Sequence, residues 1–403
     1  MPHSTTATLA RRDLLKGAAA AATFSIVAPS AVRGSAANSK IALGVIGCGG
    51  RGNWVSNLFK QHGGYQITAC GDYFADRVES YGKKFGVPAA QRYTGLTNHA
   101  KLLAGAKVDA VAVESPPYFH PVQAAAAVEA GKHVFVAKPV AVDVPGCLTI
   151  GEAGKKASAK KLVFLVDFQT RADKFYQEAI KRVHNGDIGR LINGTAFYFC
   201  GPIMAGQNSP ADAEGKLRKW VLNKTLSGDI ITEQNIHCLD VLAWIADADP
   251  ISAVGTCGQR IRKGDQTTSD FFNLVFEFPR GLAASFASRQ CGKGPGGIFC
   301  TMYGTSGAVE TQYGGTVKVY GNAPYPGGQT GSIFRDGCVN NIATFHKSIT
   351  EGVTHNPTVA ASVRSNLTTI LGRDAAYTGR KVAWDDMMKA KTKVQADLTG
   401  LRA

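Results

Sequence analysis

The sequence predicts a two-domain α/β protein whose first domain is a doubly wound parallel sheet. Three observations support this prediction. The chain has 403 residues, more than one hydrophobic core normally supports. Its 44% hydrophobic and 19% charged residues are typical of a folded globular protein. A glycine-rich loop follows an early apolar run, and strand-like and helix-like stretches then alternate as far as "KLVFLVDF" at 161–168.

The first element is the run "KIALGVIGCGGRG", a β-rich stretch that ends in a Gly-x-Gly-x-x-Gly loop. Gly47 permits the tight turn, Gly49 lets the backbone approach a pyrophosphate, and Gly52 lets the next helix pack on the strand. The helix "WVSNLFKQH" follows, and its first turn offers unpaired N–H groups to phosphates. Together with Gly50 and Arg51 of the same loop, these residues predict a dinucleotide site. A structural tight turn is the alternative.

The second strand, "YQITACGDYF", carries Asp72, which lies 20 residues beyond Gly52. A carboxylate at this strand end accepts hydrogen bonds from the adenosine ribose and repels a 2′-phosphate. The sequence therefore favours NAD over NADP as the cofactor, although the nearby Arg77 tempers that preference.

The following segments continue the alternation of strands and helices. "VDAVAVESPP", "KHVFVAKP" and "KLVFLVDF" are typical of buried strands, and "HPVQAAAAVEAG" and "VPGCLTIGEAGKKAS" are typical of helices. Ligands of such sheets bind outside the carboxyl ends of the strands. We therefore expect Ser115, Pro116 and Lys138 beside the nicotinamide half of the cofactor.

Residues 1–37 predict an export signal of the twin-arginine type. Arg11 and Arg12 precede Leu-Leu-Lys, an Ala-rich apolar stretch follows, and small residues then offer cleavage sites. The motif departs from the usual pattern at Ala10 and Leu14. We expect the twin-arginine export machinery as a partner and a periplasmic or otherwise exported location. A basic cytoplasmic arm or a membrane anchor is the alternative.

Composition argues against several other classes of protein. The formal charge is +15, but the basic cluster "GKKASAKK" has no interleaved aromatic residues, so we expect a solvated helix face and no nucleic-acid partner. Acidic sugars or an anionic envelope surface remain alternatives. The nine cysteines show no CxxC pair and no metal-like spacing. We therefore predict no metal site and no disulfide framework, and one disulfide pair stays open. After residue 30 no apolar run is long enough to span a bilayer.

The chain resembles the Gfo/Idh/MocA family of oxidoreductases over roughly residues 39–385. The motifs are "GVIGCGGRG", "ESPPYFH", "AGKHVFVAKP", "EAIKRVHNGDIGRL" and "EQNIHCLDVLAW". The resemblance implies a Rossmann domain over 38–162. It also implies an α/β substrate and oligomerisation domain over 163–403 with an open, mostly antiparallel sheet, whose helices in 339–385 pack back on the first domain. It further implies a homodimer or homotetramer and a cofactor contact at His120, the last residue of "ESPPYFH".

The resemblance also implies the reactive groups Lys138, Glu233 and His237. The residues themselves agree, because in "GDIITEQNIHCLDVLAW" Glu233 and His237 are i,i+4 neighbours on a helical face that includes Asp240 and Trp244. In the expected mechanism, neutral His237 takes the proton of a hydroxyl while hydride moves to the nicotinamide. Lys138 hydrogen-bonds the same oxygen. A purely structural histidine is the alternative.

The chain departs from the family at Ala137, where a glutamate normally precedes the Lys-Pro pair. Glu114 ends the neighbouring strand, and we hypothesise that the charge has moved there. In the alternative, Lys138 only contacts phosphate or ribose and hydride chemistry has been lost. Four residues are further candidates for a polyol pocket, each with a structural alternative: Gln169, Arg171, Trp220 and Asp240.

Three functions fit an exported protein that meets no pool of free NAD outside the cell. The first is an NAD-dependent oxidoreductase that acts on a sugar, glycoside or cyclitol hydroxyl and recycles a tightly bound cofactor. The second is a redox-neutral NAD-dependent glycoside hydrolase of the same fold, and the third is a non-catalytic sugar- or nucleotide-binding protein. "EQNIHCLD" resembles the dehydrogenase motif and favours the first function. The presence of both Lys138 and His237 disfavours the third.

Overall fold

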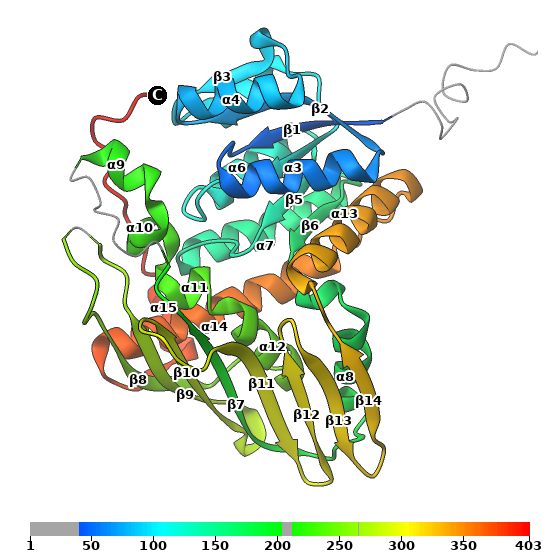
Figure 1. The fold of residues 1–403 in the computed structure, drawn as a ribbon, viewed down its shortest axis with the longest axis vertical. Coiled ribbons are helices and arrows are strands. Elements are labelled where there is room, and N and C mark those ends of the chain that lie inside the picture. Colours follow the sequence, from blue (N-terminus) through cyan, green and yellow to red (C-terminus); the bar gives the residue numbers. More distant parts are fainter. Residues whose placement is uncertain (1–39, 204–211, 265) are drawn as a thin grey trace, which may run out of the picture. The chain divides into compact units, whose positions relative to one another are not determined.

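The computed structural model describes residues 40–203, 212–264 and 266–403 (Figure 1). The predicted export signal at residues 1–37 lies outside the described residues. Within those three ranges, no helix combines the length and the apolar character needed to cross a bilayer.

The first sheet has six parallel strands in the order β3-β2-β1-β4-β5-β6. This order confirms the predicted doubly wound Rossmann sheet. The last strand, β6, lies beyond residue 162, so the predicted boundary of the first domain was placed too early. The strands are β1 (Ile41–Ile46), β2 (Tyr65–Asp72), β3 (Arg92–Thr94), β4 (Ala110–Val113), β5 (His133–Ala137) and β6 (Phe164–Asp167).

Helices bury both faces of this sheet, and alternate strand residues therefore belong to two apolar clusters. On β5, Phe135 packs in the cluster of α3, α4 and α13, whereas Val134 and Val136 pack in the cluster of α5, α6 and α7. The helices are α3 (Gly50–His62), α4 (Ala75–Phe85), α5 (Asn98–Gly105), α6 (His120–Glu129), α7 (Val144–Ala159) and α13 (Ile333–Glu351), with a short η1 (Ala89–Gln91).

The second sheet has nine strands in the order β14-β13-β12-β11-β7-β10-β9-β8-β15. Strand β10 runs parallel to β7 and the other neighbours are antiparallel, which confirms an open, mostly antiparallel sheet. The strands are β7 (Leu191–Cys200), β8 (Ser252–Gly258), β9 (Phe271–Glu277), β10 (Ala283–Gln290), β11 (Gly297–Gly304), β12 (Gly307–Gln312), β13 (Thr316–Gly321), β14 (Tyr325–Gln329) and β15 (Val382–Ala383).

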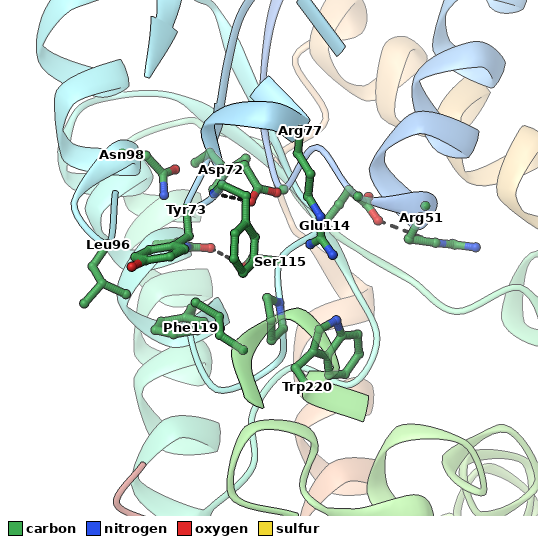
Figure 2. Close-up of a pocket in the computed structure, with 18 residues that line it drawn as sticks. Arg51, Asp72, Tyr73, Arg77, Leu96, Asn98, Glu114, Ser115, Phe119 and Trp220 are labelled. Atoms are coloured by element: carbon green, nitrogen blue, oxygen red, sulfur yellow. Dashed lines mark hydrogen bonds and ion pairs between the residues drawn. The ribbon is translucent and has the colours of Figure 1, made fainter. Parts of the chain in front are cut away.

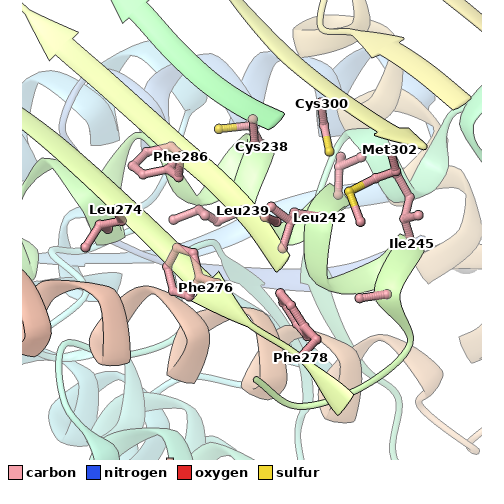
Figure 3. Packing of buried hydrophobic residues seen from close by; sticks show 14 of the residues in the cluster. Cys238, Leu239, Leu242, Ile245, Leu274, Phe276, Phe278, Phe286, Cys300 and Met302 are labelled. Carbon is pink, nitrogen blue, oxygen red and sulfur yellow. The ribbon is translucent and has the colours of Figure 1, made fainter. Parts of the chain in front are cut away.

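One face of the second sheet packs on helix α12 (Ile236–Ala246), as Figure 3 shows. Phe276 and Phe286 of the sheet lie against Leu239 and Leu242 of this helix. The long helix α14 (Pro357–Thr378) contacts β8 as well as α7 and β6, so it links the two sheets. The remaining helices are α8 (Lys174–His184), α9 (Ala213–Arg218), α10 (Lys224–Ser227), α11 (Asp229–Glu233), α15 (Trp384–Ala390), η2 (Thr170–Ala172), η3 (Trp220–Leu222) and η4 (Pro279–Gly281).

Candidate active site

The glycine-rich loop between β1 and α3 has the close contacts that only glycine allows. Gly47 has a φ of +104°, and a Cβ there would lie 2.5 Å from the carbonyl carbon of Glu114. A Cβ on Gly52 would lie 1.8 Å from the Gly47 oxygen, whereas one on Gly50 would meet no atom within 4 Å. No side chain caps helix α3 at Gly49. Its first N–H groups are therefore available to the phosphates of a dinucleotide, and the loop fits that cofactor.

Asp72, at the end of β2, holds this loop in place through hydrogen bonds. Its carboxylate accepts hydrogen bonds from the main-chain N–H of Cys48 at 2.8 Å and of Phe74 at 3.0 Å. Burial raises the pKa of Asp72. Beside it, the Arg77 guanidinium lies 4.8 Å from the centre of the Phe74 ring.

A pocket opens above the loop, with Leu96 and Asn98 at one end and Arg51 with Glu114 at the other (Figure 2). Trp220, predicted as part of a polyol pocket, lies on η3 and lines this pocket, and its substrate contact stays a prediction. The pocket brings together these predicted cofactor residues: Gly47, Gly49, Gly50, Arg51, Asp72, Ser115 and Pro116. Sequence reasoning missed these members: Tyr73, Phe74, Leu96, Asn98, Phe119, Gln123 and Leu217. Aromatic residues directly after "GD" and "SPP" were the available signal.

Two later parts of the chain reach the Tyr73 end of the pocket. Tyr73 Oη donates to Glu214 Oε1 of α9 at 2.7 Å and accepts from the main-chain N–H of Arg402 at 3.2 Å. Arg402 belongs to residues 391–403, here called the tail segment. An apolar cluster joins the three regions, with these members: Tyr73, Phe74, Leu96, Leu217, Trp220, Leu226, Ala396, Leu398 and Leu401.

His120 connects two loops at the strand ends. Its ring nitrogens lie 2.8 Å from the Pro139 carbonyl oxygen and 2.7 Å from that of Ser115. Burial lowers the pKa of His120 to about 4. The side chain thus fixes the loops that carry Ser115 and Lys138, and its predicted cofactor contact stays a prediction.

Lys138 meets Glu233 at a break between two helices. The sequence predicted one continuous helix with Glu233 and His237 one turn apart, and this is wrong, because α11 ends at Glu233 and α12 begins at Ile236. Lys138 Nζ donates to the Glu233 main-chain carbonyl and lies 3.5 Å from its carboxylate Oε1. In an unbroken helix this carbonyl would accept from the N–H of His237. That N–H instead lies 3.3 Å from the carbonyl oxygen of Gln234.

His237 lies on the first turn of α12 with a buried ring. Its Nδ1 has no hydrogen-bond partner, and the ring packs 5.0 Å from the Tyr313 ring. Burial, together with the positive charges of Lys138 and Arg51, lowers the pKa of His237 well below its ordinary value. Burial also lowers the pKa of Lys138, against the opposing effect of Glu233. A neutral imidazole beside an amine is suited to proton transfer from a hydroxyl.

Carboxyl groups flank Ala137 on both sides. Glu114 lies one strand over, as the compensation hypothesis requires, but burial raises its pKa to about 8. Asp167, which sequence reasoning did not select, pairs with Ala137 from β6. Arg51 forms ion pairs with Asp167 and, at 3.5 Å, with Glu114. Whether Glu114 replaces the missing glutamate in function stays a prediction.

Three of the predicted substrate residues make internal contacts. Gln169 Nε2 donates to Asp167 at 2.8 Å. Arg171 Nε donates to Asp240 at 2.9 Å, and Asp240 also accepts from Ser365 Oγ at 2.6 Å. Asp240 is fully buried. These contacts favour the structural alternative, and substrate contacts by these residues stay a prediction.

Within the described ranges, no group of three or more His, Cys, Asp or Glu side chains is arranged to hold a metal ion. All nine cysteines fall in those ranges and are free thiols.

The comparisons with known proteins agree with this geometry. Residues 41–165 match the model "Oxidoreductase family, NAD-binding Rossmann fold", and residues 176–310 match the Gfo/Idh/MocA C-terminal domain. Inositol 2-dehydrogenase 3 of Saccharopolyspora erythraea is 31% identical over 275 residues, which cover 67% of this chain and 72% of that protein.

Two solved structures share the fold. The aldose-aldose oxidoreductase of Caulobacter crescentus, complexed with glycerol, has a TM-score of 0.67 and 20% identity over 85% of this chain and 99% of that one. A levoglucosan dehydrogenase in complex with NADH and levoglucosan has a TM-score of 0.68 and 18% identity over 86% and 99%. With both domain models and the dehydrogenase relative in agreement, the chain belongs to the Gfo/Idh/MocA family of oxidoreductases and carries an NAD-binding Rossmann domain.

Proposed function

We propose that the protein is an exported NAD-dependent oxidoreductase that acts on a hydroxyl of a sugar, glycoside or cyclitol and reuses a bound cofactor in place. The observation that carries the proposal is the meeting of Lys138, Glu233 and His237 at the carboxyl edge of the Rossmann sheet. The relatives named for inositol, aldose and levoglucosan support this class of substrate.

The proposed chemistry divides the work between two side chains. The bound dinucleotide supplies the hydride acceptor. The neutral imidazole of His237 takes the proton from the substrate hydroxyl. The amine of Lys138, held by Glu233, donates a hydrogen bond to the same oxygen and stabilises the negative charge that develops there.

The walls of the pocket support the proposed retention of the cofactor. Helix α9 and the tail segment contact Tyr73, which lies directly beyond Asp72. These contacts would hinder release of a ligand at this end of the pocket. A cofactor that stays bound must return its hydride to a second substrate at the same site.

The proposal that the protein is exported rests on the export signal predicted at residues 1–37. The twin-arginine pathway carries folded proteins, so a protein using it takes up NAD in the cytoplasm and brings it along. The proposed location is therefore the periplasm or another exported compartment.

The face of the second sheet opposite α12 supports self-association as a homodimer or homotetramer. Phe197 and Phe299 stack at 4.6 Å on this face, and Val275 and Tyr303 are 41% and 49% exposed. Apolar residues gathered on a broad sheet face are typical of protein interfaces. The assembly would leave the cofactor pocket, which lies at the other sheet, accessible.

The test uses exported protein purified without added cofactor. We expect bound NAD and an NADH absorbance and fluorescence signal after addition of myo-inositol, levoglucosan or glucose. His237→Gln should lower the rate by about 10²–10⁴-fold, while His355→Gln, an exposed histidine between α13 and α14, should leave it unchanged. Cleavage of p-nitrophenyl glycosides without net reduction would support the glycoside hydrolase instead. If His237→Gln reduces bound NAD and cleaves glycosides as fast as the wild type, the proposal is overturned.

A further inference from the structure

Three residues at the ends of neighbouring strands form a row on one face of the Rossmann sheet. Val113 of β4 pairs with Val136 of β5, and Ala137 pairs with Asp167 of β6. Glu114, Ala137 and Asp167 are therefore side by side in register and point to the face that carries α3 and α13. The small side chain of Ala137 leaves a gap between two carboxyl groups.

Arg51 of α3 fills this gap. Its guanidinium pairs with Asp167 and with Glu114, whose side chains are both 0% exposed. The same guanidinium lies 4.7 Å from the Trp54 ring and 5.2 Å from the Phe334 ring. Two ion pairs and two ring contacts restrict the movement of this guanidinium, so its charge is held in position.

This fixed charge lies near the reacting groups. Lys138 directly follows Ala137, and both Lys138 and His237 interact electrostatically with Arg51. The charged and titratable groups around His237 come from several elements: Lys138 after β5, Glu233 of α11, Tyr313 after β12 and Arg51 of α3, which itself faces Glu114, Asp167 and Cys338.

We propose that Arg51 is a positioning residue of the reaction, held over Ala137 by Glu114 and Asp167 so that a fixed positive charge stands beside Lys138 and His237. The charge disfavours a proton on His237 and keeps the imidazole in the form that accepts one from the substrate hydroxyl. Burial is the largest cause that lowers the pKa of His237, and the positive charges of Lys138 and Arg51 act in the same direction. The inference rests on the proposed role of His237 as the base.

The experiment follows the His237 ring directly and needs no substrate. Protein labelled with ¹³C at histidine Cε1 is titrated by NMR from pH 4 to pH 8, and His237→Gln assigns the signal. Arg51→Met removes the charge, Arg51→Lys keeps it, and Arg51→Met/Asp167→Asn also removes the buried carboxylate that would lose its partner. Arg77→Met is the matched control, because Arg77 lines the same pocket without an ion pair to Glu114 or Asp167 in the described residues.

We expect the titration midpoint of His237 to rise by about one pH unit in Arg51→Met and in the double variant. It should stay near the wild-type value in Arg51→Lys and Arg77→Met. If the wild-type ring does not titrate down to pH 4, a midpoint above pH 4 in the charge-removing variants is the supporting result. An unchanged midpoint in both charge-removing variants, or no midpoint above pH 4 in either, overturns the inference.

A kinetic measurement separates this outcome from failure of the proposed function. If Arg51→Met leaves the ring unchanged while His237→Gln abolishes reduction of bound NAD by myo-inositol, only the role of Arg51 is refuted. If His237→Gln keeps full activity, the proposed function itself fails whatever the NMR result. With both proposals correct, the acid limb of the pH–rate profile moves to higher pH in Arg51→Met and not in Arg51→Lys.

Discussion

The amine of Lys138 donates a hydrogen bond to the main-chain carbonyl of Glu233, 95 residues further along the chain. Lys138 follows the last residue of β5 in the first domain, and Glu233 ends α11 in the second. The contact therefore ties the carboxyl edge of the Rossmann sheet to the helix break that precedes His237. The chemistry proposed for this point would therefore draw on residues of both domains.

Replacement of Lys138 tests its role toward the substrate oxygen. We expect Lys138→Met to lower the single-turnover rate of NAD reduction by myo-inositol by about 10²–10³-fold, because a donor to the developing charge is lost. Stopped-flow fluorescence of bound NADH measures the rate. The exposed Lys318 of β13 provides the control Lys318→Met, and equal rates in both variants would refute a catalytic role.

The pH dependence of stability should reveal Glu114. Its pKa of about 8 lies above the ordinary 4.5, so the folded state binds the proton more tightly than the unfolded state. The stability that this group contributes is complete below about pH 4.5 and is lost as the pH rises to about 8. In urea unfolding, Glu114→Gln should therefore lose less stability than the wild type between pH 5 and pH 8.5, by about 4 kcal/mol. Glu351→Gln, at an exposed position, should follow the wild type.

Two glycines of the loop should respond differently to the same substitution. Gly52→Ala places a Cβ 1.8 Å from the Gly47 oxygen, so α3 must move away from the loop. We expect a loss of about 1–3 kcal/mol in unfolding free energy and weaker NAD binding. Gly50→Ala meets no atom within 4 Å and should change stability by less than about 0.5 kcal/mol. Calorimetry of unfolding and of NAD binding distinguishes the two, and equal stabilities would contradict the packing argument.

The tail segment should slow release of the cofactor. In Leu398→Ala/Leu401→Ala, apolar contacts with the pocket cluster are lost, and we expect NADH to dissociate about tenfold faster or more. A chase of bound NADH with excess NAD, followed by fluorescence, gives the rate. Val353→Ala, at an exposed site after α13, is the control. If NADH dissociates at the same rate from both variants, the tail segment does not contribute to cofactor retention.

Charges on the face of the second sheet opposite α12 should disrupt self-association. Val275→Lys/Tyr303→Lys introduces two cations among the apolar residues of this face. Light scattering after size-exclusion chromatography should show a smaller assembly than the wild type, whereas Val353→Lys should not change the mass. If the double variant keeps the wild-type mass, the interface lies elsewhere.

The sequence predicted the Rossmann sheet and its glycine loop because both depend on local patterns. The apolar runs around "GVIGCGG" and "VDAVAV" and the spacing of Gly47, Gly49 and Gly52 are visible in a few dozen residues. Asp72 was found for the same reason, since it follows the loop at a fixed distance.

The features that sequence reasoning missed depend on contacts between distant residues. At the break after Glu233, Lys138 donates to the carbonyl that would otherwise continue the helix. Asp167 could be recognised as the partner of Ala137 only once β5 and β6 were known to be adjacent and in register. Trp220 reached the cofactor pocket through the fold of η3, which a local pattern does not reveal.

The wall of the pocket combines parts of the chain that are synthesised at very different times. Tyr73 meets Glu214 and Arg402, which leave the ribosome long after the Rossmann strands. A nascent chain that has not reached Arg402 therefore lacks this part of the wall beside Tyr73. If these contacts slow release, as proposed, ribosome-bound intermediates halted before Arg402 should lose nucleotide faster than the released protein.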